Sequence, residues 1–396
     1  MQARSLLVDN VWMRGIYVHI PFCVRKCSYC DFYSVPASPP WRREYPGLLA
    51  REMDLLLARF PEEAAAVSDT VYFGGGTPTV LGPEVLCGLL SAVRERFSIA
   101  AGAEVTTEAN PGSVFSGDLK ALREGGFNRI SIGAQSFAPA TLRTLGRIHG
   151  EEDVRRTFRN ARSAGFPAVG IDLIFGIPGQ TAASWREDLE RTITLSPSHV
   201  SAYALAPEPG TPIHTAIGRG ELRMPSDDEA AELYEAAGTL LSSEGLTRYE
   251  ISNFALPGQE CRHNLKYWRR DGYLGFGPSA HGLLFPQDEA PYGLRTANPS
   301  SLAEYEPPVR EGRPAWSETG TCTPEDAWKE SLIFGLRMAD GIDIRQIEKR
   351  LGALPEALGG AVEVLVASGM LESEGDRLRL PERLFFVSNE VFARLA

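Results

Sequence analysis

Three cysteines near the start of the chain are the residues whose type and spacing best suit metal chemistry. Cys23, Cys27 and Cys30 lie within eight residues, directly after an apolar run over 15–22. The chain has only six cysteines in 396 residues, so this C-x3-C-x2-C spacing asks for a specific cause. Thiolates in such an arrangement suit a zinc ion or an iron–sulfur cluster. Buried thiols, or a disulfide plus one free cysteine, are the structural alternatives.

The number of thiols separates these interpretations. A structural zinc site is closed by four ligands, and no second C-x2-C pair exists to complete one. The other cysteines, Cys87, Cys261 and Cys322, are scattered singly. A cubane held by three cysteines leaves one iron open, which is what a substrate-like ligand needs in order to bind there. The pattern therefore favours an iron–sulfur cluster over zinc.

The cysteine pattern after a first strand, with Tyr29 just before the last cysteine, resembles the radical S-adenosylmethionine (SAM) superfamily. The resemblance implies a [4Fe-4S] cluster on Cys23, Cys27 and Cys30, whose open iron chelates the amino and carboxylate groups of SAM. It also implies that one electron from the cluster cleaves SAM to a 5′-deoxyadenosyl radical. That electron would come from a donor protein such as flavodoxin or ferredoxin. The protein's part in such chemistry is position and shelter.

Composition limits the class of protein. The length suits two or three domains, and an apolar content of 43% is ample for a buried core. The formal charge of −11 argues against a surface for nucleic acid. Six cysteines in so long a chain do not indicate a disulfide framework, and a reducing cytoplasm suits an oxygen-sensitive cluster. The apolar run over 5–8 is too short for a signal peptide, and no stretch approaches a membrane span, although peripheral membrane contact stays open.

Strand-like and helix-like segments alternate from residue 15 to about 250. Helical stripes such as Leu49, Met53, Leu56 and Phe60 separate the candidate strands, and further helices are expected around 85–93, 151–164 and 181–195. Six strand–helix units in series predict an α/β protein with a parallel sheet and right-handed crossovers. Six units rather than eight suggest an incomplete (β/α)6 barrel, which the resemblance also implies. The candidate strands cover 16–20, 70–73, 104–107, 129–133, 169–175 and 199–205.

Residues whose side chains or backbone could bind a ligand or take part in chemistry follow the ends of these strands. The carboxyl ends of parallel strands meet at one rim, where active sites of barrels are built. Successive glycines at 74–76 let the backbone approach a ligand closely, although alone they would indicate only a tight turn. For Glu108 and Asp172 an ordinary cap or salt bridge is the alternative.

The radical SAM resemblance assigns roles to this rim. It implies that the glycine run contacts the methionine amino group of SAM, that Glu108 meets the ribose hydroxyls or amine, and that Gln135, Arg147 and Asp172 surround the adenosyl part. Tyr17, which shares a strand face with His19, would also line the pocket. The expected cofactor-binding set is Tyr17, Tyr29, Gly75, Gly76, Thr77, Glu108, Gln135, Arg147, Asp172, Ala204 and His263.

A second concentration of chemistry lies over 261–281, where aromatic rings, glycines and two histidines gather. Aromatic side chains and glycines make a slot for a flat ring system, and imidazole ligates iron; packing of a loop over the barrel mouth is the alternative. The string His263-Asn-Leu-Lys-Tyr-Trp268 resembles a radical SAM branch that contains the oxygen-independent coproporphyrinogen III oxidase HemN and the heme chaperone HemW. This implies heme as a third ligand, with His263 as first candidate for iron and Cys261 and His281 as others.

From about residue 315 the pattern changes to short helices at 328–338, 344–351 and 358–368, a small hairpin over 370–380 and a last helix ending at Leu395. This unit is winged-helix-like and similar to the C-terminal domain of the HemN/HemW branch. Winged helices often bind DNA, but residues 323–396 hold 13 acidic and 9 basic residues, which argues against it. The expected division is a core barrel over 1–250, an aromatic and histidine-rich connecting segment over 251–314, and the C-terminal domain over 315–396.

Two functions remain open within this branch. One is a heme-binding carrier that delivers heme to an apo-hemoprotein; the other is an enzyme of porphyrin metabolism that converts coproporphyrinogen propionates to vinyl groups. The oxidases carry a fourth cysteine two positions after the third, where this chain has Phe32, and a longer segment before the first cysteine. Both departures favour the carrier. Whether SAM is cleaved, and hence whether the chain is an enzyme, is left undecided by the sequence.

Overall fold

The protein is described by a computed structural model of residues 13–286 and 289–396. The apolar run over 5–8, interpreted above as too short for a signal peptide, lies outside the described residues. The six predicted strands all form and lie side by side in chain order, each parallel to the next. They are β1 (Arg14–Ile20), β4 (Ser68–Gly75), β5 (Ile99–Ala109), β6 (Arg129–Gln135), β7 (Ala168–Phe175) and β8 (His199–Ala204).

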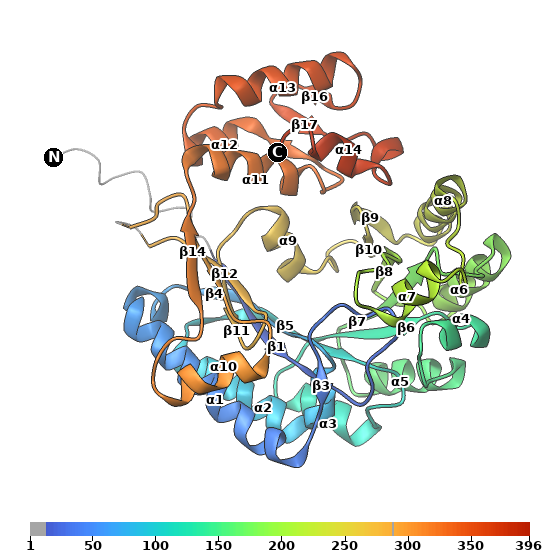
Figure 1. The fold of residues 1–396 in the computed structure, drawn as a ribbon, viewed down its shortest axis with the longest axis vertical. Helices are drawn as coiled ribbons and strands as arrows, with labels where there is room; N and C mark the ends of the chain where they lie inside the picture. Colours follow the sequence, from blue (N-terminus) through green and yellow to red (C-terminus); the bar gives the residue numbers. More distant parts are fainter. Residues whose placement is uncertain (1–12, 287–288) are drawn as a thin grey trace.

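The strands are rich in β-branched and other apolar residues because both faces of a parallel sheet are covered. In β1 and β7 all but one residue are buried. Helices cover the outer face of the curved sheet (Figure 1), so the interior of the barrel faces the other way. The incomplete parallel barrel predicted from the sequence is confirmed. The helices of this part are α1 (Pro39–Arg59), α2 (Pro83–Arg96), α3 (Ser116–Glu124), α4 (Pro139–Thr144), α5 (Glu151–Ser163) and α6 (Ala182–Thr194), with short turns η1 (Pro61–Ala64) and η2 (Pro78–Leu81).

The sheet continues beyond the six predicted strands on both edges. On one side β11 (Tyr273–Phe276) pairs with β1 in parallel, and β12 (His281–Leu284), β13 (Leu294–Ala297) and β14 (Ser317–Thr321) follow antiparallel. On the other side β10 (Asn253–Ala255) and β9 (Thr247–Glu250) close the edge at β8. The division of the chain at residues 250 and 315 stays a proposal, and the sheet runs across its first boundary.

The Pro- and Gly-rich stretch over 206–230 contains a short helix, α7 (Pro212–Gly218), before α8 (Asp227–Ser243). Thr211 starts α7, since its hydroxyl accepts the His214 N–H at 3.3 Å. Ile213 is 1% exposed and packs with Leu145 and Ile177 in a small second core. The Ile213 N–H also donates to the Ser28 carbonyl at 2.9 Å, so this stretch fastens the cysteine loop.

The C-terminal part forms as the sequence predicts, with three helices, a hairpin and a last short helix above the barrel (Figure 1). Between it and the barrel lies α9 (Arg262–Trp268), which carries the His-Asn-x-x-Tyr-Trp string. No helix in the described part of the chain is long and apolar enough to cross a membrane. The remaining elements are β2 (Phe22–Cys23), β3 (Val35–Pro36), α10 (Leu302–Arg310), α11 (Pro324–Gly335), β15 (Ile342–Asp343), α12 (Ile344–Leu351), α13 (Glu356–Ala367), β16 (Glu372–Glu374), β17 (Arg377–Arg379), η3 (Glu382–Leu384) and α14 (Ser388–Phe392).

Candidate functional site

A cavity of about 370 Å³ occupies the interior of the barrel. It reaches from the cysteine loop at the carboxyl ends of the strands down to α9, and most of the residues selected from the sequence line it. Separate βα units contribute these side chains, because a parallel barrel turns all its strand ends to one rim. The predicted residues on its wall are Cys23, Cys27, Tyr29, Cys30, Gly75, Gly76, Thr77, Glu108, Gln135, Arg147, Asp172 and Ala204.

The three loop cysteines are free thiols on the cavity wall. Cys23 Sγ lies 3.4 Å from the Thr77 hydroxyl, and Arg147 Nη1 donates to Cys27 Sγ at 3.4 Å. Burial raises the pKa of Cys23 and of Cys30. The thiols are thus held beside polar donors, and the alternative of a disulfide plus one free cysteine is wrong for this structure.

The donor set suits a cluster better than a single ion. Over 13–286 and 289–396, no three side chains of His, Cys, Asp or Glu converge on a point that could hold one metal ion. In a cubane each thiolate binds a different iron, so its cysteine ligands do not have to converge. The three soft sulfurs on the cavity wall are therefore a donor set that would suit an iron–sulfur cluster.

The glycine run packs tightly against the cysteine loop. The Gly76 and Thr77 N–H groups donate to the carbonyls of Ile20 and Phe22 at 2.9 and 2.8 Å. A Cβ at Gly76 would lie 2.7 Å from the Phe22 carbonyl oxygen, and Gly75 has a φ of 107°. Glycine is thus required at these positions because the backbone packs so closely against other backbone atoms. As a result, Gly75 and Gly76 present backbone without side chains to the cavity.

Two carboxylates face the cavity. Glu108 accepts a hydrogen bond of 2.7 Å from the Tyr72 hydroxyl, and Asp172 accepts from Ser131 and Ser201 at 2.9 and 2.7 Å. Burial raises the pKa of Glu108 to about 7; nearby Asp172 adds to the rise, and the Tyr72 hydroxyl opposes it. Burial also raises the pKa of Asp172. A carboxylate has about four acceptor positions, so both groups can accept further hydrogen bonds from a ligand in the cavity.

Arg147 is fixed between the cysteine loop and the strand ends. Its Nη2 donates to the Gly133 carbonyl at 2.5 Å and to Asn110 Oδ1 at 2.7 Å, and Asn110 in turn donates to the Thr77 hydroxyl at 2.7 Å. Gln135, at the end of β6, has a φ of 65°, a left-handed conformation that is uncommon without glycine and that clusters at functional sites.

Tyr17 and His263 do not line the cavity, unlike the rest of the predicted set. His263 is 2% exposed, with Nδ1 2.8 Å from the Thr70 hydroxyl and Nε2 2.9 Å from the Tyr267 hydroxyl. It stacks on Tyr72 with ring centroids 5.2 Å apart, and Tyr17 lies against both rings. Burial lowers the pKa of His263 to about 3. Both ring nitrogens are therefore occupied inside the protein.

The other two candidates for a heme ligand lie elsewhere. Cys261 lines the inner end of the cavity, and burial together with Glu104 raises the pKa of its thiol. His281 begins β12 and has an exposed side chain. The structure therefore does not bring the three candidates together, and only Cys261 belongs to the cavity.

Several cavity residues were missed from the sequence. Arg129 and His199 are the first residues of β6 and β8, and the cavity reaches them at the amino ends of these strands. Active-site residues of a barrel are expected at the carboxyl ends of its strands, so residues at the amino ends are usually interpreted as structural. A charged residue and an imidazole beginning otherwise apolar strands were the available signal.

Comparison with known proteins extends over nearly the whole chain. Profiles of the radical SAM superfamily and of the HemN C-terminal domain match residues 17–192 and 322–386. The chain is 33% identical to the protein named heme chaperone HemW of Bacillus subtilis, covering 96% of this chain and 98% of that one. It is 37% identical to HemW of Mycobacterium tuberculosis, covering 93% and 91%.

Among solved structures, the coproporphyrinogen III oxidase HemN of Escherichia coli superposes with a TM-score of 0.81 at 23% identity, covering 98% of this chain and 91% of that one. At this identity the likeness bears on the fold alone. The sequence likeness to the HemW proteins is closer and spans both matched profiles. The chain belongs to the radical SAM superfamily and, within it, to the HemW family.

Proposed function

We propose that the chain is a heme chaperone, which binds heme and passes it to apo-hemoproteins. The observation that carries this proposal is identity of 33–37% to proteins named heme chaperone HemW over more than nine-tenths of the chain. The His263–Trp268 string supports it, as does Phe32, which stands where the oxidases have a fourth cysteine. The Phe32 side chain is 65% exposed at the cavity mouth and offers no ligand for iron.

The same chain is proposed to hold a SAM-binding [4Fe-4S] cluster. Cys23, Cys27 and Cys30 would supply its thiolates, and a bound cluster would supply one-electron chemistry at its open iron. Glu108 and Asp172, which line the same cavity as the cysteines, would accept hydrogen bonds from SAM. Thr77, whose hydroxyl lies 3.4 Å from Cys23 Sγ, would lie beside the cluster. Arg147 would keep the strand ends at the rim in place through its hydrogen bonds to Asn110 and Gly133.

The recipient of heme is proposed to be an apo-hemoprotein of the cytoplasm, and the electron donor a flavodoxin or ferredoxin. A reducing compartment suits free thiols and an oxygen-sensitive cluster, and six free cysteines agree with such a compartment. Within the chain, the barrel over 1–250 is the part proposed to bind the cluster and SAM.

The runner-up function is the oxygen-independent coproporphyrinogen III oxidase reaction. It is favoured by a fold shared with the Escherichia coli HemN structure, but identity there is 23%, so that likeness carries no substrate. The oxidases also carry a fourth cysteine at the position where this chain has Phe32.

The two functions are separated by one anaerobic experiment. The cluster is reconstituted, and the protein is incubated with reductant and SAM together with either coproporphyrinogen III or heme. The proposal predicts a stable Soret band with heme, transfer of that heme to an apo-hemoprotein, and no protoporphyrinogen. Formation of protoporphyrinogen, or failure of the full-length protein to retain heme on a desalting column, would overturn it.

A further inference from the structure

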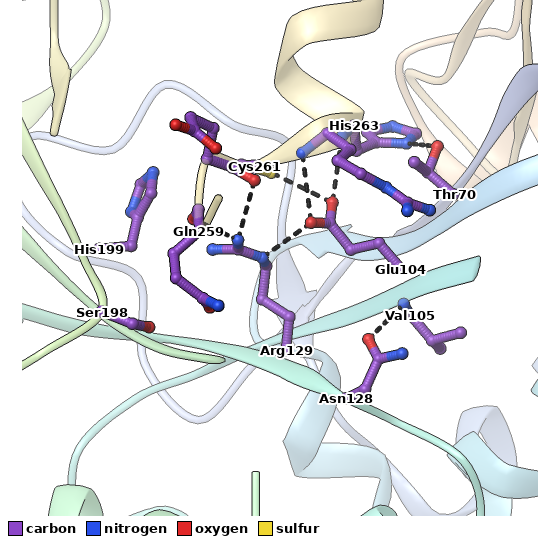
Figure 2. A network of polar contacts seen from close by, with 12 residues as sticks. Thr70, Glu104, Val105, Asn128, Arg129, Ser198, His199, Gln259, Cys261 and His263 are labelled. Atoms are coloured by element: carbon purple, nitrogen blue, oxygen red, sulfur yellow. Dashed lines mark hydrogen bonds and ion pairs between the residues drawn. The ribbon is translucent and has the colours of Figure 1, made fainter. Parts of the chain in front are cut away.

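Glu104 and Arg129 form a buried ion pair beneath the segment 259–264 (Figure 2). Cys261 and Asn264 of this segment line the inner end of the cavity. They come from neighbouring strands, β5 and β6, and Arg129 Nε lies 2.9 Å from Glu104 Oε2. The side chain of Arg129 is 7% exposed and that of Glu104 is 9% exposed. Burying such a pair is costly unless further hydrogen bonds satisfy both groups, so the location of those bonds indicates what the pair is for.

The carboxylate of Glu104 is directed at backbone donors of the segment. Oε2 accepts from the Arg262 N–H at 3.2 Å, and Oε1 accepts from the His263 N–H at 3.0 Å. The Cys261 thiol donates to Oε1 at 3.6 Å. One carboxylate therefore holds three successive residues, which lie more than 150 positions further along the chain.

The guanidinium of Arg129 holds the preceding residues by their acceptors. Its Nη2 donates to the carbonyls of Gln259 and Glu260 at 2.5 and 3.0 Å. Figure 2 shows the pair below the segment, with contacts from both groups converging on it. The carbonyls of residues 259–260 thus accept hydrogen bonds from the Arg129 cation. The donors of residues 261–263 bond to the Glu104 anion beside it.

We propose that Glu104 and Arg129 are positioning residues that set where the segment 259–264 lies, and thereby place Cys261 and Asn264 at the inner end of the cavity. Both of these residues line the cavity, whereas their neighbour His263 is turned away from it. The pair thus determines which side chains a ligand deep in the barrel meets. The inference concerns the ligand-free protein, and only its effect on heme rests on the proposed function.

The variant Glu104→Gln tests this, because an amide of the same shape has one accepting oxygen and cannot serve two N–H groups, the guanidinium and the thiol. Losing hydrogen bonds to a charged acceptor should speed hydrogen exchange of the Arg262 and His263 amides by about ten- to a hundredfold. Alkylation of Cys261, followed peptide by peptide with mass spectrometry, should accelerate by a similar factor, while Cys87 and Cys322 react as in the wild type.

Arg129→Lys is the second variant. It keeps the positive charge beside Glu104, but a single ammonium group replaces the separate nitrogens by which Arg129 contacts Glu104 (Nε) and the two carbonyls (Nη2). Its effects on exchange and alkylation should therefore be in the same direction and smaller. A charge-only role for the pair would instead leave this variant equal to the wild type, which would overturn the inference.

Glu52→Gln is the matched control for general destabilisation. Glu52 is likewise a buried carboxylate that accepts a backbone N–H, from Gly277 at 2.8 Å, and it lies outside the cavity. Glu52→Gln should lower the melting temperature without speeding alkylation of Cys261. If Glu104→Gln and Glu52→Gln change Cys261 equally at matched stability, the pair is merely structural and the inference is overturned.

Heme loading separates this inference from the proposed function. If wild-type protein binds no heme while Glu104→Gln still exposes Cys261, the chaperone function fails and the positioning role stands. If wild-type protein binds heme and Glu104→Gln leaves Cys261 alkylation and amide exchange unchanged, the positioning role fails and the function stands.

Discussion

The Nδ1 atom of His263 lies 2.8 Å from the hydroxyl of Thr70, a residue of β4 that precedes it by 193 positions. The other ring nitrogen is taken by Tyr267 at 2.9 Å, and a Cβ added to Gly15 would lie only 3.0 Å from the ring. The imidazole thus joins α9 to β1 and β4 and is part of the packing of the barrel. As an iron ligand it would first have to leave one of these partners.

For His263→Ala we therefore expect a loss of stability of about 2–4 kcal/mol, from a cavity and from two hydroxyl groups that lose their partner. The measurement is urea unfolding of the ligand-free protein. The Soret maximum of heme-loaded protein should stay in place, because the axial bond would come from another residue. A shifted or lost Soret band in folded protein would show instead that His263 ligates iron and that α9 turns when heme binds.

Replacing any one of Cys23, Cys27 and Cys30 by alanine should abolish the cluster, because a cubane left with two protein thiolates is not retained. Iron and inorganic sulfide are measured after anaerobic reconstitution. Cys87→Ala and Cys322→Ala are the controls, and both should keep wild-type iron and sulfide. Tightly bound zinc in place of iron and sulfide would contradict the proposed cofactor.

Gly76→Ala should disturb the proposed SAM site through the backbone. The added Cβ would collide with the Phe22 carbonyl, pushing the glycine run away from the cysteine loop. We expect a stability loss of about 1–3 kcal/mol and SAM affinity at least about tenfold weaker, measured by equilibrium dialysis of reconstituted protein.

Gly88→Ala provides the comparison, since the space around this glycine within α2 is open and alanine favours a helix by about 0.5–1 kcal/mol. This variant should be slightly more stable and bind SAM as the wild type does. Equal SAM affinity in both variants would show that the glycine run does not contact the cofactor.

Glu108 should make the stability of the ligand-free protein depend on pH. Its pKa is raised from 4.5 to about 7 in the folded chain, so between these values the folded state binds more protons than the unfolded state. The free energy of unfolding therefore falls as pH rises through this window, by on the order of 3 kcal/mol from this group. Glu52, whose pKa burial also raises to about 7, contributes in the same direction.

Glu108→Gln should flatten this slope between pH 5 and 7 in urea unfolding experiments, and Glu52→Gln should do so independently, because a neutral amide does not titrate. Only Glu108→Gln should also weaken SAM binding, since only Glu108 lines the cavity. A pH dependence identical to wild type in Glu108→Gln would show that this carboxyl titrates normally.

The sequence alone determined the parallel barrel, the cysteine loop and the rim. The reason is that these depend on short-range signals. Strands of β-branched residues alternate with helical stripes such as Leu49, Met53 and Leu56, and each βα unit forms next to the previous one. Once the strands are parallel, residues such as Glu108 and Asp172 must meet at the same end.

Only the tertiary structure decided the pairing of β11 with β1, the burial of His263 and the roles of Glu104 and Arg129. Each depends on contacts between segments more than 100 residues apart, and nothing in the local pattern states which segments meet. The sequence around His263 is compatible with an iron ligand and with simple packing, and only the contact of α9 with β4 shows that the imidazole is packed in the barrel. A buried charge is tolerated only where distant partners satisfy it, so its role becomes visible only once the chain has folded.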